Sequence, residues 1–209
     1  MTCCKKILVV AAHPDDEILG CGGTMAIHAD RGDEVYVVFM TDGVSSRGSK
    51  DSLLENINQR KLSAMEACKE VGAQEPKFLS FPDNQMDSCS LLEITQGLEN
   101  IINKIKPEVI YTHHDKDLNV DHRLTHQAVM TACRPHPNNF ISEIYSFEVL
   151  SSTGWNSTSV ENIFLPNVFI DLTKAWERKM RALSFYNYEL KSYPHARSYK
   201  GVKSLAVFR

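Results

Sequence analysis

The feature that most constrains the fold is an uninterrupted apolar run followed closely by a block of acidic and imidazole side chains. Residues 7–11 read Ile-Leu-Val-Val-Ala, and residues 13–17 read His-Pro-Asp-Asp-Glu. A continuous apolar run is typical of a strand that is buried on both faces of a parallel sheet. Carboxylate and imidazole groups at the end of such a strand are costly to bury unless a cation compensates them. The block therefore predicts a metal-dependent hydrolytic site at the end of a buried strand.

Strand and helix patterns alternate along most of the chain. Apolar runs predict strands over 6–12, 34–40, 77–81, 108–112, 141–150 and 167–172. Apolar spacing and turn residues predict helices over 24–29, 51–71, 91–105, 121–133 and 174–188. We expect an α/β fold, a three-layer α/β/α sandwich with a Rossmann-like, mostly parallel sheet, in a single domain over 1–209. The glycine-rich stretch at 20–23 predicts a break before the first helix, and Met25 at the third glycine position argues against a dinucleotide site.

The composition excludes several functional classes. Apolar residues make up 43% of the chain and charged residues 23%, which is ordinary for a globular protein. The net charge of −3 gives no electrostatic case for binding nucleic acid. No stretch approaches the roughly 18 apolar residues of a membrane span, and the run after Lys5 and Lys6 is too short for a signal peptide. The six cysteines show no CxxC spacing, so we expect reduced thiols and a cytoplasmic protein.

A second polar cluster follows the predicted strand at 108–112. It begins with His113 and His114, which we interpret as strand-end packing, and it continues through an acidic run to His122. In parallel α/β sheets the functional crevice lies beyond the carboxyl ends of the strands. The two clusters therefore converge if the strands at 6–12 and 108–112 are neighbours.

Three side chains from these clusters are candidate metal ligands. His13 and Asp16 are close enough in sequence for one tight turn to aim both at a single cation, and His122 at a helix start is our choice for the third ligand. His126, one turn further along the same helix, is a rival. Two histidines and a carboxylate leave coordination positions for water and substrate, as catalytic Zn²⁺ sites require. Fe²⁺ or another divalent ion is the alternative cofactor.

The remaining carboxylates suggest how such a site works. Asp15 is adjacent to a ligand without being needed as one, so it can take a proton from a metal-bound water and return it to a leaving amine. Asp121 would orient a neighbouring ligand. This division of labour fits amide hydrolysis.

The block at 13–17, the glycines at 20–23 and the distant pair Asp121-His122 together resemble the PIG-L/LmbE-like family of zinc-dependent N-deacetylases. The resemblance implies removal of acetyl from N-acetyl amino sugars. It also implies metal ligation by His13, Asp16 and His122, with Asp15 as general base. Arg60 lies in a helix similar to the family's arginine-bearing helix, which implies contact with a small acetylated amino sugar or sugar conjugate.

The chain departs from the family pattern in two places. Family members carry a histidine that stabilises the oxyanion at the position of Asn119, so this catalytic role falls to Asn119 or to His114 or His195. The stretches 147–153 and 194–198 look like those of a bacterial subgroup that handles surface glycans, which implies that His195 and Arg197 bind substrate. Similar chains continue into a glycine-containing tail, whereas this one stops at Arg209.

Two other functions stay open. The ligand set also matches the facial triad of a 2-His-1-carboxylate iron oxygenase. An α/β pattern argues against it, because such enzymes favour all-β barrels and would leave Asp15 without a role. A non-catalytic sugar-binding protein on the same fold is the third hypothesis. Relatives often form symmetric multimers, so a homo-oligomer is a further expectation.

Overall fold

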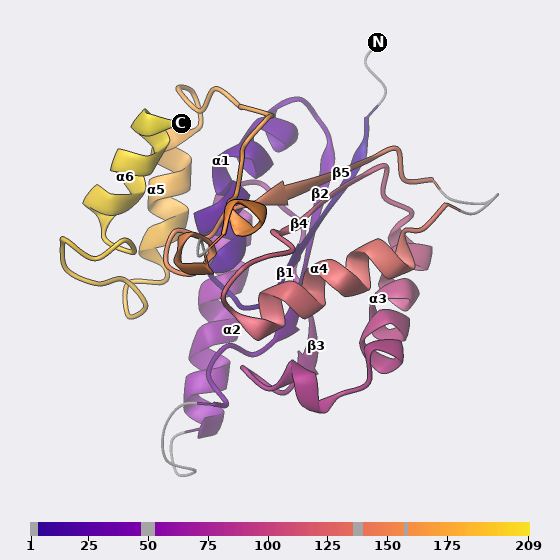
Figure 1. Cartoon of the computed structure of the whole chain (residues 1–209). Coiled ribbons are helices and arrows are strands. Elements are labelled where there is room, and N and C mark those ends of the chain that lie inside the picture. The colour runs from indigo at the N-terminus through magenta and orange to yellow at the C-terminus, as the bar shows by residue number, and fades with distance from the viewer. Residues whose placement is uncertain (1–3, 47–52, 136–139, 157–158) are drawn as a thin grey trace.

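The computed structural model describes residues 4–46, 53–135, 140–156 and 159–209, and within them five strands form one parallel sheet (Figure 1). The strands are β1 (Lys6–Ala11), β2 (Glu34–Thr41), β3 (Lys77–Phe81), β4 (Val109–His113) and β5 (Glu143–Phe147). They lie in the order β3-β2-β1-β4-β5. Every neighbouring pair is parallel, which confirms the predicted α/β class and sheet type.

Helices cover both faces of the sheet and make three layers. Figure 1 shows α5 and α6 beside α1 on one side, and α3 and α4 on the other. The helices are α1 (Asp16–Asp30), α2 (Leu53–Glu70), α3 (Leu91–Ile105), α4 (Val120–Ala132), α5 (Trp176–Ser184) and α6 (Tyr199–Phe208). The alternation of β1 explains the layers: Ile7 and Val9 join a core with α1, α2 and α5, whereas Leu8 and Val10 join a core with α3 and α4. None of the helices in the described segments is both long enough and apolar enough to cross a bilayer.

Most of the element bounds lie within two residues of the predictions, and five elements differ by more. The strand predicted at 141–150 is shorter, because β5 ends at Phe147, and the helix predicted at 174–188 ends at Ser184. The predicted strand at 167–172 is wrong, because the chain there forms neither strand nor helix. α6 has no counterpart among the predicted elements. The first helix begins at Asp16, so the glycine stretch at 20–23 lies inside it, with a kink at Cys21 (φ −137°, ψ 16°). Residues 51 and 52 of the second predicted helix lie outside the described residues.

Close packing explains the glycines that suggested a break. A Cβ atom at Gly20 would collide with the ring of Phe147, which ends β5. A Cβ atom at Gly23 would lie 2.6 Å from a methyl group of Leu172. The glycines therefore let α1 approach the sheet edge and the segment that leads into α5.

Helix α5 attaches to α1 close to the kink. The buried Lys179 of α5 donates a hydrogen bond from Nζ to the carbonyl oxygen of Leu19 at 3.0 Å. Burial lowers the pKa of Lys179 to about 8. This anchor holds α5 against α1, and the segment after α5 can then reach the end of β1.

The strand order places a topological switch point between β1 and β4. β2 and β3 lie on one side of β1, while β4 and β5 lie on the other. β1 and β4 are paired neighbours, so the condition set by the sequence for convergence of the two polar clusters is met. In sheets of this type the crevice beyond the strand ends at such a point binds the ligand.

Candidate metal centre

The turn from β1 into α1 holds Asp15 in a strained backbone conformation. Its φ of 127° lies where non-glycine residues rarely occur. The Asp15 N–H donates to Oε2 of the buried Glu17 at 2.9 Å, and the Tyr186 hydroxyl donates to Oε1 of Glu17 at 2.7 Å. Burial raises the pKa of Glu17 to about 8, against the effect of these hydrogen bonds. Tyr186, from the segment after α5, therefore helps through Glu17 to fix the conformation of this turn.

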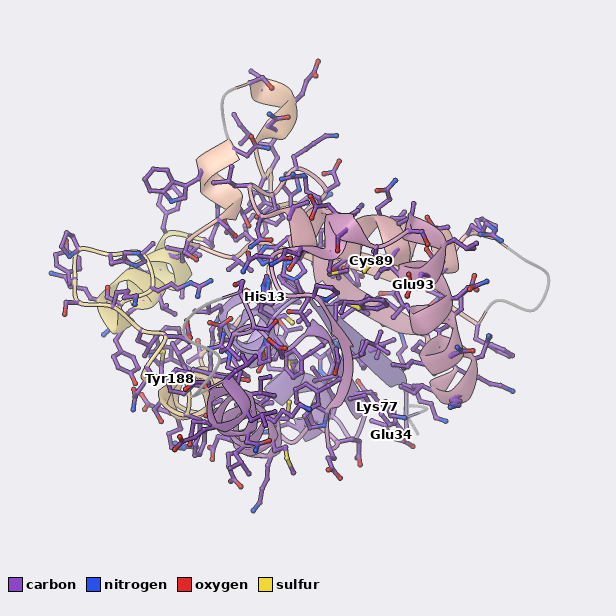
Figure 2. The ribbon with its side chains drawn as sticks, turned by 90° about the horizontal axis from the view of Figure 1, so that it is seen from below. His13, Glu34, Lys77, Cys89, Glu93 and Tyr188 are labelled. Atoms are coloured by element: carbon purple, nitrogen blue, oxygen red, sulfur yellow. The ribbon has the colours of Figure 1, made fainter. Side chains whose placement is uncertain are left out.

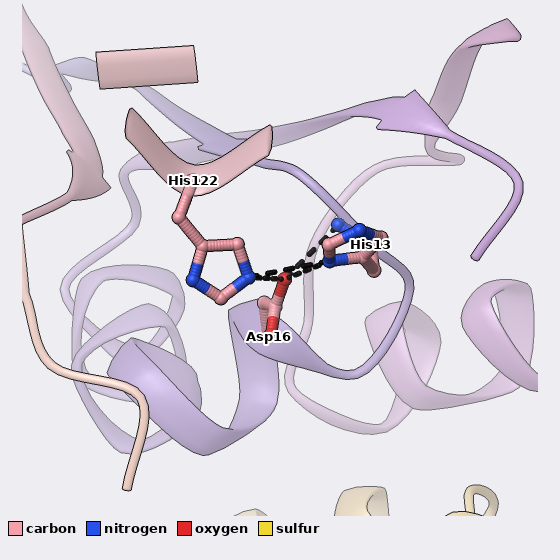
Figure 3. A group of neighbouring side chains, drawn as sticks. All are labelled: His13, Asp16 and His122. Carbon is pink, nitrogen blue, oxygen red and sulfur yellow. Dashed lines mark hydrogen bonds and ion pairs between the residues drawn. The ribbon is translucent and has the colours of Figure 1, made fainter. Parts of the chain in front are cut away.

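The three predicted ligands meet at one point (Figure 3). Nδ1 of His13 lies 3.0 Å from Oδ2 of Asp16, Nε2 of His122 lies 3.1 Å from the same oxygen, and the two nitrogen atoms are 3.2 Å apart. A tetrahedral ion with bonds of about 2.0–2.1 Å holds its ligand atoms roughly 3.3 Å apart. In addition, the buried Oδ1 of Asp16 has no hydrogen-bond partner among the described residues. The donor set therefore fits a divalent cation, and the cluster is a candidate metal centre.

The carboxylates and imidazoles of this cluster stabilise a positive charge between them. Burial by itself lowers the pKa of His13, but the carboxylates of Asp121, Asp16 and Asp83 outweigh it and raise the pKa to about 10. Burial likewise opposes ionisation of Asp16, yet His122 and His13 hold the pKa of Asp16 well below its usual range. A cation is therefore stabilised between these groups, whether it is a proton or a metal ion.

Asp117, which the sequence analysis did not single out, is the carboxylate that contacts Nδ1 of His122. Its Oδ2 lies 3.2 Å from Nδ1 of His122 and accepts hydrogen bonds from the hydroxyls of Thr153 (2.6 Å) and Ser152 (3.1 Å). Its Oδ1 accepts from the N–H of Asn119 at 2.8 Å. Asp117 therefore fixes the ring orientation of the third ligand. The only signal in the sequence was its place in the acidic run before His122.

Asp121 contacts His13 rather than its neighbour in sequence. Its Oδ2 lies 3.1 Å from Nε2 of His13. It also accepts backbone hydrogen bonds from Asn84 at 2.7 Å and from Met86 at 3.1 Å. The buried Asp83 was also missed, and its Oδ1 lies 3.5 Å from the same Nε2 atom. One nitrogen of His13 thus faces the candidate metal position, and the other faces two carboxylates.

Asn119 has a local structural role. It is the N-cap of α4, where its Oδ1 accepts from the N–H of Asp121 at 2.8 Å. Its Nδ2 donates to Oδ1 of Asn84 at 3.1 Å. The predicted part of Asn119 in catalysis stays a prediction.

The other histidines of this region make separate contacts. Nε2 of His113 accepts from the N–H of Ala12 at 2.8 Å, and the His113 ring stacks on His122 with centroids 3.9 Å apart. Nδ1 of His126 lies 2.8 Å from the carbonyl oxygen of His113, so the rival ligand is directed at the backbone. Nε2 of His114 lies 3.2 Å from the carbonyl oxygen of Asn162.

Asp15 lies beside the ligands, between two arginines. Its Oδ2 is 3.0 Å from Nη1 of Arg197 and 3.3 Å from Nη2 of Arg60. Arg60 is buried, and its Nη1 lies 2.7 Å from Oε1 of Glu189. Burial raises the pKa of Asp15, while Arg197 and Arg60 act in the opposite direction. Two of the predicted substrate-binding residues, Arg60 and Arg197, are thus brought to the predicted base.

His195 contacts this group through the backbone of Arg197. It is exposed, and its Nδ1 accepts a hydrogen bond from the N–H of Arg197 at 3.0 Å. Figure 2 shows His13 toward the centre of the molecule. Tyr188, which lies between α5 and α6 as His195 does, is nearer the edge. The predicted contact of His195 with substrate stays a prediction.

Comparison with known proteins points to one family. The sequence profile described as PIG-L, GlcNAc-PI de-N-acetylase, matches residues 8–133. An uncharacterized deacetylase from Escherichia coli K12, YaiS, is 35% identical over 170 residues, which cover 79% of this chain and 80% of that protein. The 4-oxalmesaconate hydratase of Pseudomonas putida KT2440 is 27% identical over 199 residues, covering 86% of this chain and 72% of the relative.

The fold is also that of a solved enzyme. The structure of N,N'-diacetylchitobiose deacetylase from Pyrococcus horikoshii, complexed with an inhibitor, superposes with a TM-score of 0.77 at 22% identity. The alignment covers 98% of this chain and 78% of that one. This likeness extends well beyond residue 133, so it includes the C-terminal helices.

Proposed function

Because this chain belongs to the PIG-L family, we propose that it is a metal-dependent hydrolase that removes the acetyl group from an N-acetyl amino sugar or a conjugate of one. The observation that carries the proposal is the convergence of Nδ1 of His13, Oδ2 of Asp16 and Nε2 of His122 within 3.2 Å of one another. They meet at the switch point of the sheet, where such folds bind ligands.

We propose Zn²⁺ as the ion held by these residues, since two imidazoles and one carboxylate are a common ligand set for catalytic zinc. When bound, the ion would polarise the acetamide carbonyl and make a nearby water molecule more acidic. Asp117 keeps the ring of His122 oriented through Nδ1, and Asp121 does the same for His13 through Nε2. The protein thus contributes ligands whose geometry is set before substrate arrives.

Asp15 is the proposed general base. It takes a proton from the attacking water and later gives it to the amine nitrogen as the amide bond breaks. Its position next to Asp16 in sequence and its buried carboxylate support this role. Burial raises the pKa of Asp15, and the ion pairs with two arginines oppose this effect and favour the ionised form that a base needs.

The test is a screen for acetate release from acetylated amino sugars. The substrates are N-acetylglucosamine, its nucleotide and thiol conjugates, and diacetylchitobiose. Each is incubated with purified protein, with protein treated with a chelator, and with chelated protein reloaded with Zn²⁺ or Fe²⁺. We expect acetate and free amine in equal amounts from at least one substrate, loss of turnover on chelation, and recovery on reloading. No acetate from any substrate with stoichiometric metal would refute the proposal.

A further inference from the structure

We propose that Arg197 is a positioning residue for the general base: with Arg60 it holds Oδ2 of Asp15, and only Oδ1 is left to exchange protons. This inference rests on the proposed deacetylase function. It assigns Arg197 a different role from the substrate contact that the family resemblance implied.

The two oxygen atoms of Asp15 have unlike surroundings. Oδ2 lies within ion-pair distance of both arginines, at 3.0 Å from Arg197 and 3.3 Å from Arg60. Oδ1 is buried and has no hydrogen-bond partner in the described part of the chain. A carboxylate oxygen that accepts a hydrogen bond from Arg197 and forms an ion pair with Arg60 is a poor proton acceptor, whereas an oxygen without donors keeps both lone pairs. The base therefore has one reactive oxygen.

Arg197 is itself held from several sides. Its Nε donates to Oγ of Ser151 at 2.5 Å, in the loop that follows β5. Its Nη1 lies 3.9 Å from Oε2 of Glu189. Its side chain is only 18% exposed. The guanidinium group is thus fixed with Nη1 directed at Asp15.

The charges of this group balance internally. Two guanidinium groups, Arg60 and Arg197, face two carboxylates, Asp15 and Glu189. Each arginine of the group already faces a carboxylate within it. The balance favours a role in holding Asp15 over a role in substrate affinity.

The backbone of Asp15 is fixed as well. Glu17 accepts from its N–H, and Tyr186 holds Glu17. Tyr186, Glu189 and Arg197 all come from the segment between α5 and α6, beyond the part of the chain that the family profile matches. Loss of Arg197 would leave Oδ2 of Asp15 with Arg60 alone and so loosen the orientation of the carboxylate. Misplacing a base lowers the rate of the chemical step and leaves binding of the ground state unchanged.

The experiment compares Arg197→Ala and Arg197→Lys with the wild type, all loaded with metal and assayed on the best substrate of the acetate screen. We expect kcat to fall on the order of 10- to 100-fold in R197A, with KM changed less than about twofold. R197K should recover part of kcat, and added guanidinium ion should partly restore R197A. The matched control is Arg181→Ala, which removes an exposed arginine of α5 that pairs with Glu70.

A second measurement does not depend on turnover. The dissociation constant of the same substrate is measured by calorimetry for Asp15→Asn and for the double variant that adds R197A. Equal affinities support the positioning role. A KM or a dissociation constant raised about tenfold or more by R197A, with kcat retained, would overturn it and make Arg197 a substrate contact.

Further controls distinguish a loss of positioning from a folding defect and from failure of the proposed deacetylase function. Thermal unfolding and metal content are recorded for every variant. If R197A does not fold, Ser151→Ala replaces it as the test variant, because it removes a hydrogen bond that holds Arg197 and keeps the charge of the arginine. The expected result for S151A is a smaller fall in kcat at constant KM, and an unchanged kcat would count against the proposal. If the wild type releases no acetate from any substrate, the proposed function fails. If the wild type is active and R197A has the same kcat, only the inference about Arg197 fails.

Discussion

Oδ2 of Asp117 lies 3.2 Å from Nδ1 of His122, and this carboxylate, not that of the adjacent Asp121, orients the third ligand of the candidate metal centre. Asp121 instead faces His13, from which it is 108 positions distant in sequence. Each histidine ligand therefore has its own carboxylate. The pairing is set by how α4 begins and could not be read from sequence neighbours.

Replacing Asp117 should weaken metal binding. In Asp117→Ala, His122 loses the acceptor at Nδ1, and the hydroxyls of Ser152 and Thr153 lose theirs. Carboxylate partners of this kind are typically worth about 10- to 100-fold in metal affinity. Competition with a chelating dye measures the change, and Asp115→Ala, which removes an exposed carboxylate nearby, is the control. Wild-type affinity in D117A would contradict the assigned role.

Replacing Asp15 should separate chemistry from metal binding. In Asp15→Asn the side chain keeps its volume but cannot accept a proton, so kcat should fall by about 10²–10⁴-fold. The ligands His13, Asp16 and His122 are untouched, so metal content should stay stoichiometric. Acetate release and elemental analysis on the same preparation check both statements. Full turnover in this variant would remove Asp15 from the mechanism.

Metal binding near pH 7.5 should release protons. The carboxylates that surround His13 raise its pKa to about 10 in the metal-free protein, so the ring is protonated at that pH. A metal ion needs the lone pair of Nδ1 and displaces at least one proton. Calorimetric titrations in buffers with different ionisation enthalpies should give different apparent heats. Heats independent of the buffer would show that His13 binds the metal without losing a proton.

The same shift makes the stability of the metal-free protein depend on pH. Because the pKa of His13 in the folded state lies above its ordinary value of 6.5, the folded state holds the proton more tightly. This contribution is complete below about pH 6.5 and is lost as pH rises toward 10. In urea unfolding of chelated protein, the His13 contribution to the free energy of unfolding should fall between pH 6.5 and 9. The dependence of that free energy on pH should be weaker in His13→Gln.

Adding one methyl group at Gly20 should destabilise the fold. The new Cβ atom would overlap the ring of Phe147, so α1 or the end of β5 must move. Overpacking of this kind typically costs about 1–3 kcal/mol. Gly154→Ala is the control, since no atom lies within 4 Å of a Cβ placed there. A midpoint of urea unfolding in G20A equal to that of G154A would rule out the tight contact.

The sheet was predictable because it rests on local patterns, and the convergence of its two polar clusters was predicted on the condition that their strands are neighbours. The apolar run at 7–11 has to be buried, and polar residues at the ends of neighbouring parallel strands have to meet. The start of α1 was not predictable, because its glycines suggested a break, whereas they serve contact with Phe147 and Leu172. Contacts with residues distant in sequence explain these glycines, and the local sequence pattern does not reveal such contacts.

The candidate site was predictable only in part for the same reason. The sequence indicated His13, Asp16 and His122 as candidate ligands because they follow strands or begin a helix. Glu189 and Tyr186 were missed, because they reach Arg60 and Glu17 only after α5 has packed on α1. Asp83 had a usable signal, its place after β3, but nothing in the sequence connects it to His13.

The order of these groups along the polypeptide has a consequence for its biosynthesis. The three proposed metal ligands have all left the ribosome by the time residue 122 is exposed, whereas Arg197 emerges later. A nascent chain can thus capture the proposed ion before Arg197 holds Asp15 in place, so the proposed hydrolysis also requires the later segment between α5 and α6.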